Sequence, residues 1–306
     1  MSILLAFLAS NLLTSLNLLE EPPFFVDNTI LDGSPSKNCQ AYVTVVTIDT
    51  GLDTQNKELK KYMKNDMFGN LVGGHTNEFG SFEDQNGHGT HIAWIIARES
   101  ECVKIVPISY WDEKNPKANQ TSNFIKALTH SLRYNPRVIN ISGGGPFSTD
   151  EELIILKEIE KRGILVISAA GNNGKDIDLV ENNYFPSSYR LNNMITVASV
   201  NSVGDLSETS NYGINSVDVA AFGVKIKSFG LNEQMVSLSG TSQATAQVSG
   251  LVSKIVSINP GLTNDQIKSL ITKTVDKKIE LRDKIRSGGV INKNRAISRS
   301  MDLIYN

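Results

Sequence analysis

Apolar segments with the length of strands alternate along this chain with amphipathic segments with the length of helices. Most of the strand-like segments are apolar on both faces, as strands are when helices cover both sides of a sheet. A strand, helix, strand order requires parallel pairing with right-handed crossovers. The sequence therefore predicts an α/β fold with a doubly wound, mostly parallel sheet in a three-layer α/β/α arrangement. The predicted elements up to residue 170 are 41–49, 88–99, 103–109, 121–135, 137–142, 148–163 and 164–170.

The second half of the chain continues the pattern, and we expect it to belong to the same domain up to about residue 296. A long helix is predicted from about Ser242, and another one at 263–275. Pro107 is locally unfavourable for a strand, because proline cannot donate a hydrogen bond to a central ladder. The strand-like segments before Ser242 are 194–200, 217–222, 224–229 and 234–239.

Composition and charge exclude several classes of function. The chain has 306 residues, of which 40% are hydrophobic and 20% charged, so it is long enough for a large core. Its 30 basic and 32 acidic side chains leave a net charge of -2, with no basic tract or acidic tail. We therefore expect no nucleic-acid partner. No repeat or Pro- or Gly-rich linker divides the chain, so we expect one domain over 39–306, and a monomer.

The beginning of the chain differs in composition from the rest. Residues 1–20 are mostly apolar but interrupted by polar side chains, whereas a membrane span needs about 20 mainly apolar residues. Membrane association is therefore not expected once this segment is removed. It is interpreted as a signal peptide followed by a short extension at 21–38, or as an apolar helix packed on the domain, or as a misassigned start. A signal would make the protein secreted or periplasmic; the alternative is cytoplasmic.

The two cysteines bear on the same question. Cys39 and Cys102 each precede a predicted strand. If those strands are neighbours in a parallel sheet, the two sulfur atoms meet. A disulfide would indicate an oxidising compartment, whereas two buried free cysteines fit a cytosolic protein equally well.

Several polar residues lie where chemistry is expected, since ligands bind outside the carboxyl ends of the strands in sheets of this kind. Asp49 ends the strand 41–49, and Asn172 follows the strand 164–170 on a glycine-flanked loop. His88 and Ser242 begin predicted helices, and a helix start at Ser242 would suit a developing oxyanion. Each residue alone has an ordinary interpretation as a turn former, a helix cap or the start of a tightly packed helix.

The choice of a catalytic base is narrow. The chain has only four histidines, at positions 75, 88, 91 and 130. His91 lies three residues after His88 and thus on a neighbouring part of the same helix face, where we expect burial beneath the site.

The order of these residues is more specific than any one fragment. Asp49, His88 and Ser242 follow the Asp, His, Ser order of the subtilisin triad. The chain resembles the subtilase family, the subtilisin-like serine proteases of peptidase type S8, over most of residues 41–297. The segments that carry the resemblance are VVTIDTGLD, NGHGTHIA, VINISGGGP, VISAAGNNG, SGTSQATAQVSG and SGGVINKNRAI.

The resemblance implies a subtilisin-like fold and a serine endopeptidase that works through an acyl-enzyme. Ser242 would attack the scissile carbonyl, His88 would transfer the proton, and Asp49 would orient His88. Asn172 and the backbone amide of Ser242 would form the oxyanion hole. The expected substrates are proteins or peptides, held by strand addition along SGGGP, with a broad or apolar preference at the primary pocket. The residues expected to bind substrate are Ser142, Gly143, Gly144, Ala169, Ala170 and Gly171.

The chain departs from the family pattern at five positions near the site. Gln243, Ala246 and Gln247 stand where Met, Pro and His are usual. Trp94 stands at a usual glycine, and Phe222 at a usual proline. None of these replaces a catalytic group, but the packing behind the site must differ.

No cofactor or metal site is expected. The interval after His88 has no room for the calcium loop that many secreted relatives carry, so a strong calcium site is not expected there. Glu83 and Asp84 are candidate ligands of a weak calcium site, but a solvated acidic loop is the preferred interpretation of this pair. The alternative function is a catalytically silent subtilase-like domain that acts as a binding or inhibitory module.

Overall fold

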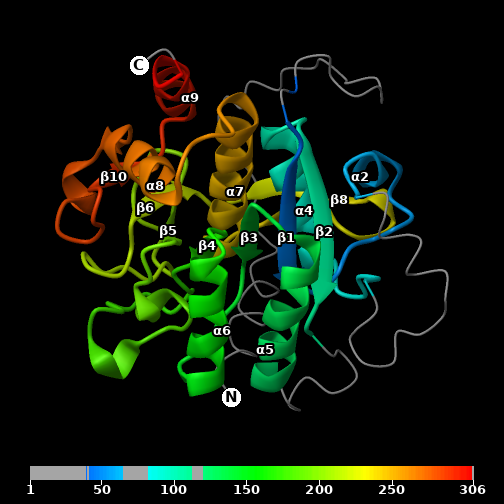
Figure 1. The fold of residues 1–306 in the computed structure, drawn as a ribbon. Coiled ribbons are helices and arrows are strands. Elements are labelled where there is room, and N and C mark those ends of the chain that lie inside the picture. Colours follow the sequence, from blue (N-terminus) through cyan, green and yellow to red (C-terminus); the bar gives the residue numbers. More distant parts are fainter. Residues whose placement is uncertain (1–38, 40, 65–81, 112–119, 305–306) are drawn as a thin grey trace, which may run out of the picture.

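The fold is a parallel sheet with helices on both faces (Figure 1). The computed structural model describes residues 39, 41–64, 82–111 and 120–304. The main sheet has the order β2-β1-β3-β4-β5-β6-β10-β9, and all its pairings are parallel except that of β9 with β10. The predicted fold class is confirmed. The strands are β1 Val43–Asp49, β2 Val103–Ser109, β3 Val138–Ile141, β4 Leu165–Ala169, β5 Met194–Val200, β6 Val219–Phe222, β9 Asp276–Lys277 and β10 Gly289–Val290.

Two groups of helices cover the two faces of the sheet. Figure 1 shows α5 and α6 side by side on one face, with α7 on the other. α4 packs against α7 and against the β1 and β2 end of the sheet, and α9 packs against α7 and α8. The helices are α2 Lys57–Lys60, α4 His88–Glu99, α5 Gln120–Ser131, α6 Asp150–Lys161, α7 Thr241–Ile258, α8 Asn264–Lys273 and α9 Lys293–Asp302.

Each face of the sheet has its own hydrophobic core. Successive residues of a strand point to opposite faces. Val43 and Val45 of β1 therefore join the core beneath α4 and α7, whereas Val46 and Ile48 join the core beneath α5 and α6. Burial on both sides explains why this strand reads as a continuous apolar run.

The strand order reverses beside β1. The chain passes from β1 to β2 on one side and then to β3 on the other side of β1. Such a switch point leaves a crevice outside the carboxyl ends of the two strands, where ligands bind in open α/β sheets. Asp49 is the last residue of β1, and Ser142 directly follows β3.

Two local expectations of the sequence are resolved by the topology. Pro107 lies in β2, which is an edge strand of the main sheet, so its missing N–H group is tolerated. The segments 224–229 and 234–239 do not join the main sheet. They contain β7 Ile226–Phe229 and β8 Met235–Leu238, which form a separate antiparallel pair. In β7, exposed Lys227 separates buried Ile226 from buried Ser228, the alternation of a strand with one face toward solvent.

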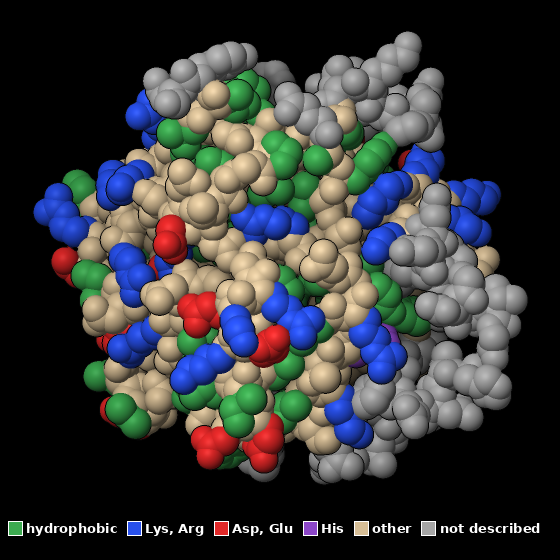
Figure 2. Space-filling view, in the orientation of Figure 1, with side chains coloured by type: hydrophobic (Ala, Val, Ile, Leu, Met, Phe, Trp, Pro, Cys, Tyr) green, Lys and Arg blue, Asp and Glu red, His purple; other side chains and the backbone are tan. Residues whose placement is uncertain are grey.

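The charged side chains of the described residues are of both signs on the face drawn in Figure 2. Figure 2 shows lysine and arginine side chains spread across the visible face and not gathered in one patch. Within the ranges that the structure describes, none of the helices has the length and apolarity to cross a bilayer. The same residues contain no cluster of three or more His, Cys, Asp or Glu side chains suited to a metal ion. The predicted segments 1–20 and 21–38 lie outside the described residues, and the domain limits stay a prediction.

A disulfide joins Cys39 to Cys102, across 63 residues of sequence. The two cysteines precede β1 and β2, which are parallel neighbours with Val43 opposite Val103. The strand register therefore brings the sulfur atoms together, and of the two interpretations of the cysteines the paired one is confirmed.

Loss of this disulfide should destabilise the fold. Because the bond closes a long loop in the unfolded chain, Cys39→Ser is expected to lower the free energy of unfolding by about 2–4 kcal/mol. Urea unfolding with and without reductant measures this. Reductant should destabilise the wild type and leave Cys39→Ser unchanged; a wild type insensitive to reductant would contradict the expectation.

Candidate active site

A cleft of 710 Å³ opens at the carboxyl edge of the sheet. Four residues that the sequence singled out, far apart along the chain, line it together: Asp49, His88, Asn172 and Ser242. Asp49 comes from the end of β1 and Asn172 from the loop after β4, while His88 and Ser242 lie at the starts of α4 and α7. The parallel sheet thus collects two strand ends and two helix starts at one place.

Asp49 and His88 form a close pair. Asp49 Oδ1 lies 2.7 Å from His88 Nδ1, and the two side chains are 3% and 13% exposed. The same carboxylate oxygen accepts a hydrogen bond of 2.8 Å from the N–H of Thr50. Since a carboxylate only accepts hydrogen bonds, the proton of a neutral His88 belongs on Nδ1. Nε2 is then the nitrogen that can accept a proton.

Two opposing effects act on the pKa of His88. Burial lowers it, because a buried imidazolium loses hydration. The charge of Asp49, its hydrogen bond and the charge of Asp84 raise it, and the net pKa lies above the usual 6.5. The cleft therefore stabilises the positively charged form of this histidine.

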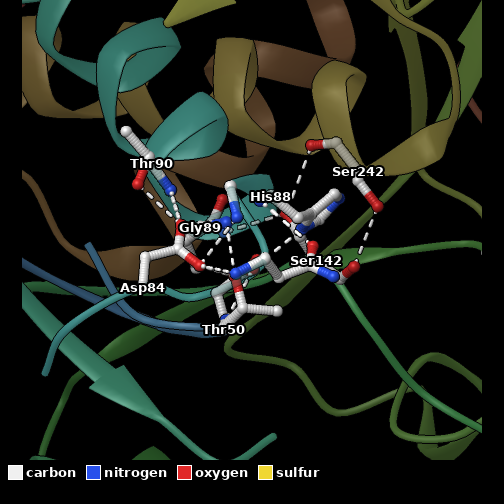
Figure 3. Close-up of polar contacts among 11 residues, drawn as sticks. Thr50, Asp84, His88, Gly89, Thr90, Ser142 and Ser242 are labelled. Atoms are coloured by element: carbon white, nitrogen blue, oxygen red, sulfur yellow. Dashed lines mark hydrogen bonds and ion pairs between the residues drawn. The ribbon is translucent and has the colours of Figure 1, made fainter. Parts of the chain in front are cut away.

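The carboxylate of Asp84 fastens the turn after β1 to the start of α4 (Figure 3). Asp84 is only 5% exposed. Its Oδ1 accepts from Thr50 Oγ1 at 2.9 Å and from the N–H groups of Asn86 and Gly87 at 2.9 and 2.8 Å. Its Oδ2 accepts from the N–H and the hydroxyl of Thr90 at 2.8 and 2.6 Å. Thr50 Oγ1 in turn accepts from the N–H of Gly89 at 2.8 Å.

Asp84 therefore does not belong to a solvated acidic loop, and the preferred interpretation of Glu83 and Asp84 is wrong for this residue. Only Glu83 is exposed, and it accepts a hydrogen bond from the hydroxyl of Thr54 at 2.6 Å. Sequence reasoning missed the role of Asp84 in holding the site. The available signal was its spacing, four residues before His88 and six before Thr90, which suits a carboxylate that folds back onto a helix start.

Ser242 lies in the first turn of α7, whose N–H groups have no acceptor within the helix. Its Oγ donates to the carbonyl of Ser142 at 2.8 Å, and Ser142 Oγ donates back to the carbonyl of Ser242 at 3.2 Å. Figure 3 shows Ser242 above the Ser142 segment, with His88 beside them. The residue before this turn must be glycine, because Gly240 has φ +153 and an added Cβ would meet Asn172 Oδ1 at 3.2 Å.

The side chain of Asn172 is held against the same helix start. The N–H of Thr241 donates to Asn172 Oδ1 at 2.9 Å, and the hydroxyl of Thr241 does so at 3.1 Å. A backbone N–H can only donate, so the atom facing it is the amide oxygen. The NH2 group of Asn172 is left as a donor beside the amides of the first turn of α7.

The residues expected to bind substrate fall into two groups. Ser142, Gly143 and Gly144 line the cleft. Ala169, Ala170 and Gly171 are buried, and the cleft lining at that place is made by other residues, Asn172 and Tyr184 among them. Their part in substrate binding stays a prediction.

His91 is fully buried beneath the cleft, as expected. Its Nε2 lies 3.0 Å from the carbonyl oxygen of Ile226 in β7. Burial and the nearby His88 lower its pKa to about 4. It is a neutral packing residue at neutral pH, and among the described residues His88 is the histidine that lines the cleft.

The bulky residues at the positions that depart from the family pattern pack against neighbouring side chains and backbone. The ring of Trp94 packs against Phe229 of β7, with centroids 4.8 Å apart, and edge-on against Tyr62 at 6.4 Å. Gln247 is buried, and its amide donates to the carbonyl of Phe222 at 2.7 Å. Trp94 therefore packs against β7, and Gln247 against the end of β6, whereas Gln243 lines the cleft directly after Ser242.

Comparison with known proteins agrees with this geometry. The model of the Subtilase family matches residues 40–293. The major intracellular serine protease of Bacillus subtilis (strain 168) is 31% identical over 235 residues, which cover 70% of this chain and 68% of that protein. The cell wall-associated protease of the same organism is 28% identical over 242 residues, 76% of this chain but 25% of that protein. The chain thus spans only a quarter of the length of the latter relative.

Solved structures agree in fold. A cold adapted subtilisin-like serine proteinase is 25% identical with a TM-score of 0.65, covering 84% of this chain and 89% of that one. The A-subunit of the AB5 toxin from E. coli is 24% identical with a TM-score of 0.71, covering 86% and 94%, and shows the fold alone. The family match extends over most of the chain and over every segment that lines the cleft, and the chain belongs to the subtilase family.

Proposed function

We propose that this protein is a serine endopeptidase that hydrolyses peptide bonds with Ser242 as the nucleophile. The observation that carries the proposal is the cleft in which Asp49, His88, Asn172 and Ser242 meet, with a 2.7 Å contact between Asp49 and His88. Family membership supports the reaction class. The catalytically silent binding or inhibitory module stays the alternative function, because Ser242 Oγ donates to the carbonyl of Ser142 in this structure.

In the first half of the reaction, Ser242 Oγ attacks the scissile carbonyl carbon while His88 Nε2 takes its proton. The imidazolium that forms is stabilised by the carboxylates of Asp49 and Asp84, which raise the pKa of His88. The carbonyl oxygen becomes an oxyanion, and the NH2 group of Asn172 and the N–H of Ser242 donate to it. His88 then gives its proton to the leaving amine, and the acyl-enzyme remains.

In the second half, water enters after the amine has left. His88 takes a proton from this water as the hydroxide attacks the acyl carbon, and the same donors hold the second oxyanion. The proton returns from His88 to Ser242 Oγ as the ester bond breaks. The products are a carboxylic acid and the restored hydroxyl group.

The substrate backbone is proposed to pair with the segment that follows β3. Gly143 and Gly144 line the cleft and are half-buried. Within the described residues, their peptide groups have no main-chain hydrogen-bond partner. An extended peptide can add there as a strand, which gives affinity through main-chain hydrogen bonds and leaves sequence selection to side-chain pockets.

We further propose that the protein works in an oxidising compartment, secreted or periplasmic. The disulfide between Cys39 and Cys102 supports this location, because such bonds persist where thiols are not kept reduced. The expectations of no cofactor and of a monomer stay predictions.

Removal of the nucleophile should abolish the activity. Ser242→Ala is expected to lower kcat/KM by about 10⁴-fold or more, since no other group can form the acyl-enzyme. Casein hydrolysis measures this, with Ser237→Ala as the control, because Ser237 is an exposed serine in β8. Equal loss in both variants, or retained hydrolysis in Ser242→Ala, would refute the assignment.

Removal of the amide donor should slow turnover. Asn172→Ala is expected to lower kcat by about 10²–10³-fold with little change in KM, the range found for the oxyanion-hole asparagine of subtilisin. The matched control is Asn173→Ala, which deletes the neighbouring, exposed amide. Steady-state kinetics of both variants give the kcat and KM values that are compared. A rise in KM at constant kcat would show that Asn172 only binds substrate.

The pH dependence of kcat/KM should reflect the charges of the two carboxylates that raise the pKa of His88, those of Asp49 and Asp84. His88 must be neutral to accept a proton, so a raised pKa moves the acid limb of kcat/KM above pH 6.5. Asp84→Asn removes one of the charges that raise this pKa and should move the limb to lower pH. It should also cost about 1.5–3 kcal/mol of unfolding free energy, because one oxygen that accepts hydrogen bonds is lost.

The control for this experiment is Glu83→Gln, which removes the same charge from the exposed neighbour. It should leave the limb in place. Kinetics and an NMR titration of the His88 ring measure the shift. An acid limb that moves equally in both variants would mean that Asp84 acts only through general surface charge.

A further inference from the structure

Tyr184 occupies the space between Gly144 and Gly171, two of the residues expected to bind substrate. An added Cβ on Gly144 would lie 2.7 Å from Tyr184 Cε1 and 3.0 Å from Cζ. An added Cβ on Gly171 would lie 2.9 Å from both Cδ2 and Cε2 of the same ring. One edge of the ring therefore packs on the Gly144 backbone, and the opposite edge packs on the Gly171 backbone.

The ring therefore fills the space that a side chain at either glycine would occupy. Both were expected to bind substrate, but Gly171 is buried while Tyr184 itself lines the cleft. The ring covers the wall that Gly171 would otherwise present to a substrate. Whatever enters between these segments meets the tyrosine first.

The backbone holds Tyr184 in this position. The N–H of Tyr184 donates to Ser188 Oγ at 2.9 Å, and the N–H of Ser188 donates back to the carbonyl of Tyr184 at 2.8 Å. The next residue, Phe185, exchanges two main-chain hydrogen bonds with Gly145, of 2.7 and 2.9 Å. The segment that carries the ring is therefore tied to the same strand extension that is proposed to pair with substrate.

The position of the ring determines which substrate side chain it faces. The scissile carbonyl must lie between Ser242 Oγ and the NH2 group of Asn172. The residue on its acyl side is bonded directly to that carbonyl, so its side chain enters between the segment 142–144 and the loop at 171–172. This is the gap that Tyr184 bridges.

We propose that the ring of Tyr184 forms the bottom of the primary pocket and makes the pocket shallow. It thereby restricts the residue on the acyl side of the cleaved bond to small side chains, such as alanine, serine or glycine. This inference rests on the proposed endopeptidase function and narrows the broad or apolar preference expected from the sequence. The ring excludes leucine or phenylalanine by volume, and it offers a short side chain an apolar surface.

The test compares succinyl-Ala-Ala-Pro-Xaa-p-nitroanilides in which Xaa is Ala, Leu or Phe. Active enzyme is counted by titration with a fluorophosphonate, which does not depend on this pocket. The wild type should cleave after Ala with a kcat/KM at least about tenfold above that after Phe. Tyr184→Ala should raise the Phe to Ala ratio of kcat/KM at least about tenfold, because the removed ring leaves room for the larger side chain.

Two further variants separate shape from other effects. Tyr184→Phe keeps the ring and should keep the wild-type order, and Tyr184→Leu should give an intermediate ratio. A wild type that cleaves after Phe as well as after Ala would overturn the inference, whether or not Tyr184→Ala folds. A Tyr184→Ala enzyme that is labelled but has an unchanged ratio would also overturn it. Failure of the folded wild type to react with the fluorophosphonate would instead refute the endopeptidase function.

Discussion

The contact between the end of β1 and the start of α4 determines where the polar groups of the cleft lie. The two segments approach so closely that an added Cβ on Gly89 would lie 2.9 Å from the backbone nitrogen of Gly51. The buried carboxylate of Asp84 accepts five hydrogen bonds across this contact, from both sides of it. Asp49 ends one of these two segments and His88 begins the other. The contact between the segments therefore brings Asp49 Oδ1 within 2.7 Å of His88 Nδ1.

The second half of the cleft is built in the same manner. The start of α7 packs against the loop after β4, where Thr241 donates to Asn172 and the N–H of Gly171 donates to the Thr241 hydroxyl at 3.2 Å. Asp84, four residues before His88, and Thr241, one residue before Ser242, thus hold the two helix starts from positions that do not line the cleft. The acid and base come from one such unit and the nucleophile and amide donor from the other, and the sheet sets the distance between them.

The sequence predicted the elements well, because they depend on local pattern, and it named four polar residues that the structure brings to one cleft. Continuous apolar runs identified strands such as β1, and the order of Asp49, His88 and Ser242 identified the constellation. The sequence could not show that β7 and β8 pair with each other outside the main sheet, because the residues of a short strand do not indicate which strand it pairs with. Neighbouring strands made the disulfide between Cys39 and Cys102 foreseeable only as one of two alternatives.

Residues that act through three-dimensional contact escaped the sequence. Asp84 looked like part of a solvated acidic loop, because burial depends on how the chain folds back over it. Tyr184 lies twelve positions after Asn172 in a segment without a motif, and its effect arises only from two glycines that are distant from each other along the chain. Which polar groups meet at the cleft is thus readable from residue type and order, whereas the way in which His88 is held and the shape of the cleft depend on packing.

The central claim is that the fold makes the hydroxyl of Ser242 a nucleophile. Mass mapping of the folded protein after reaction with a fluorophosphonate tests it most directly. The account predicts one adduct, on Ser242, that does not form when the protein is unfolded first, because activation requires the assembled cleft. A folded protein that gains no adduct, or gains it on another hydroxyl group, would contradict the account.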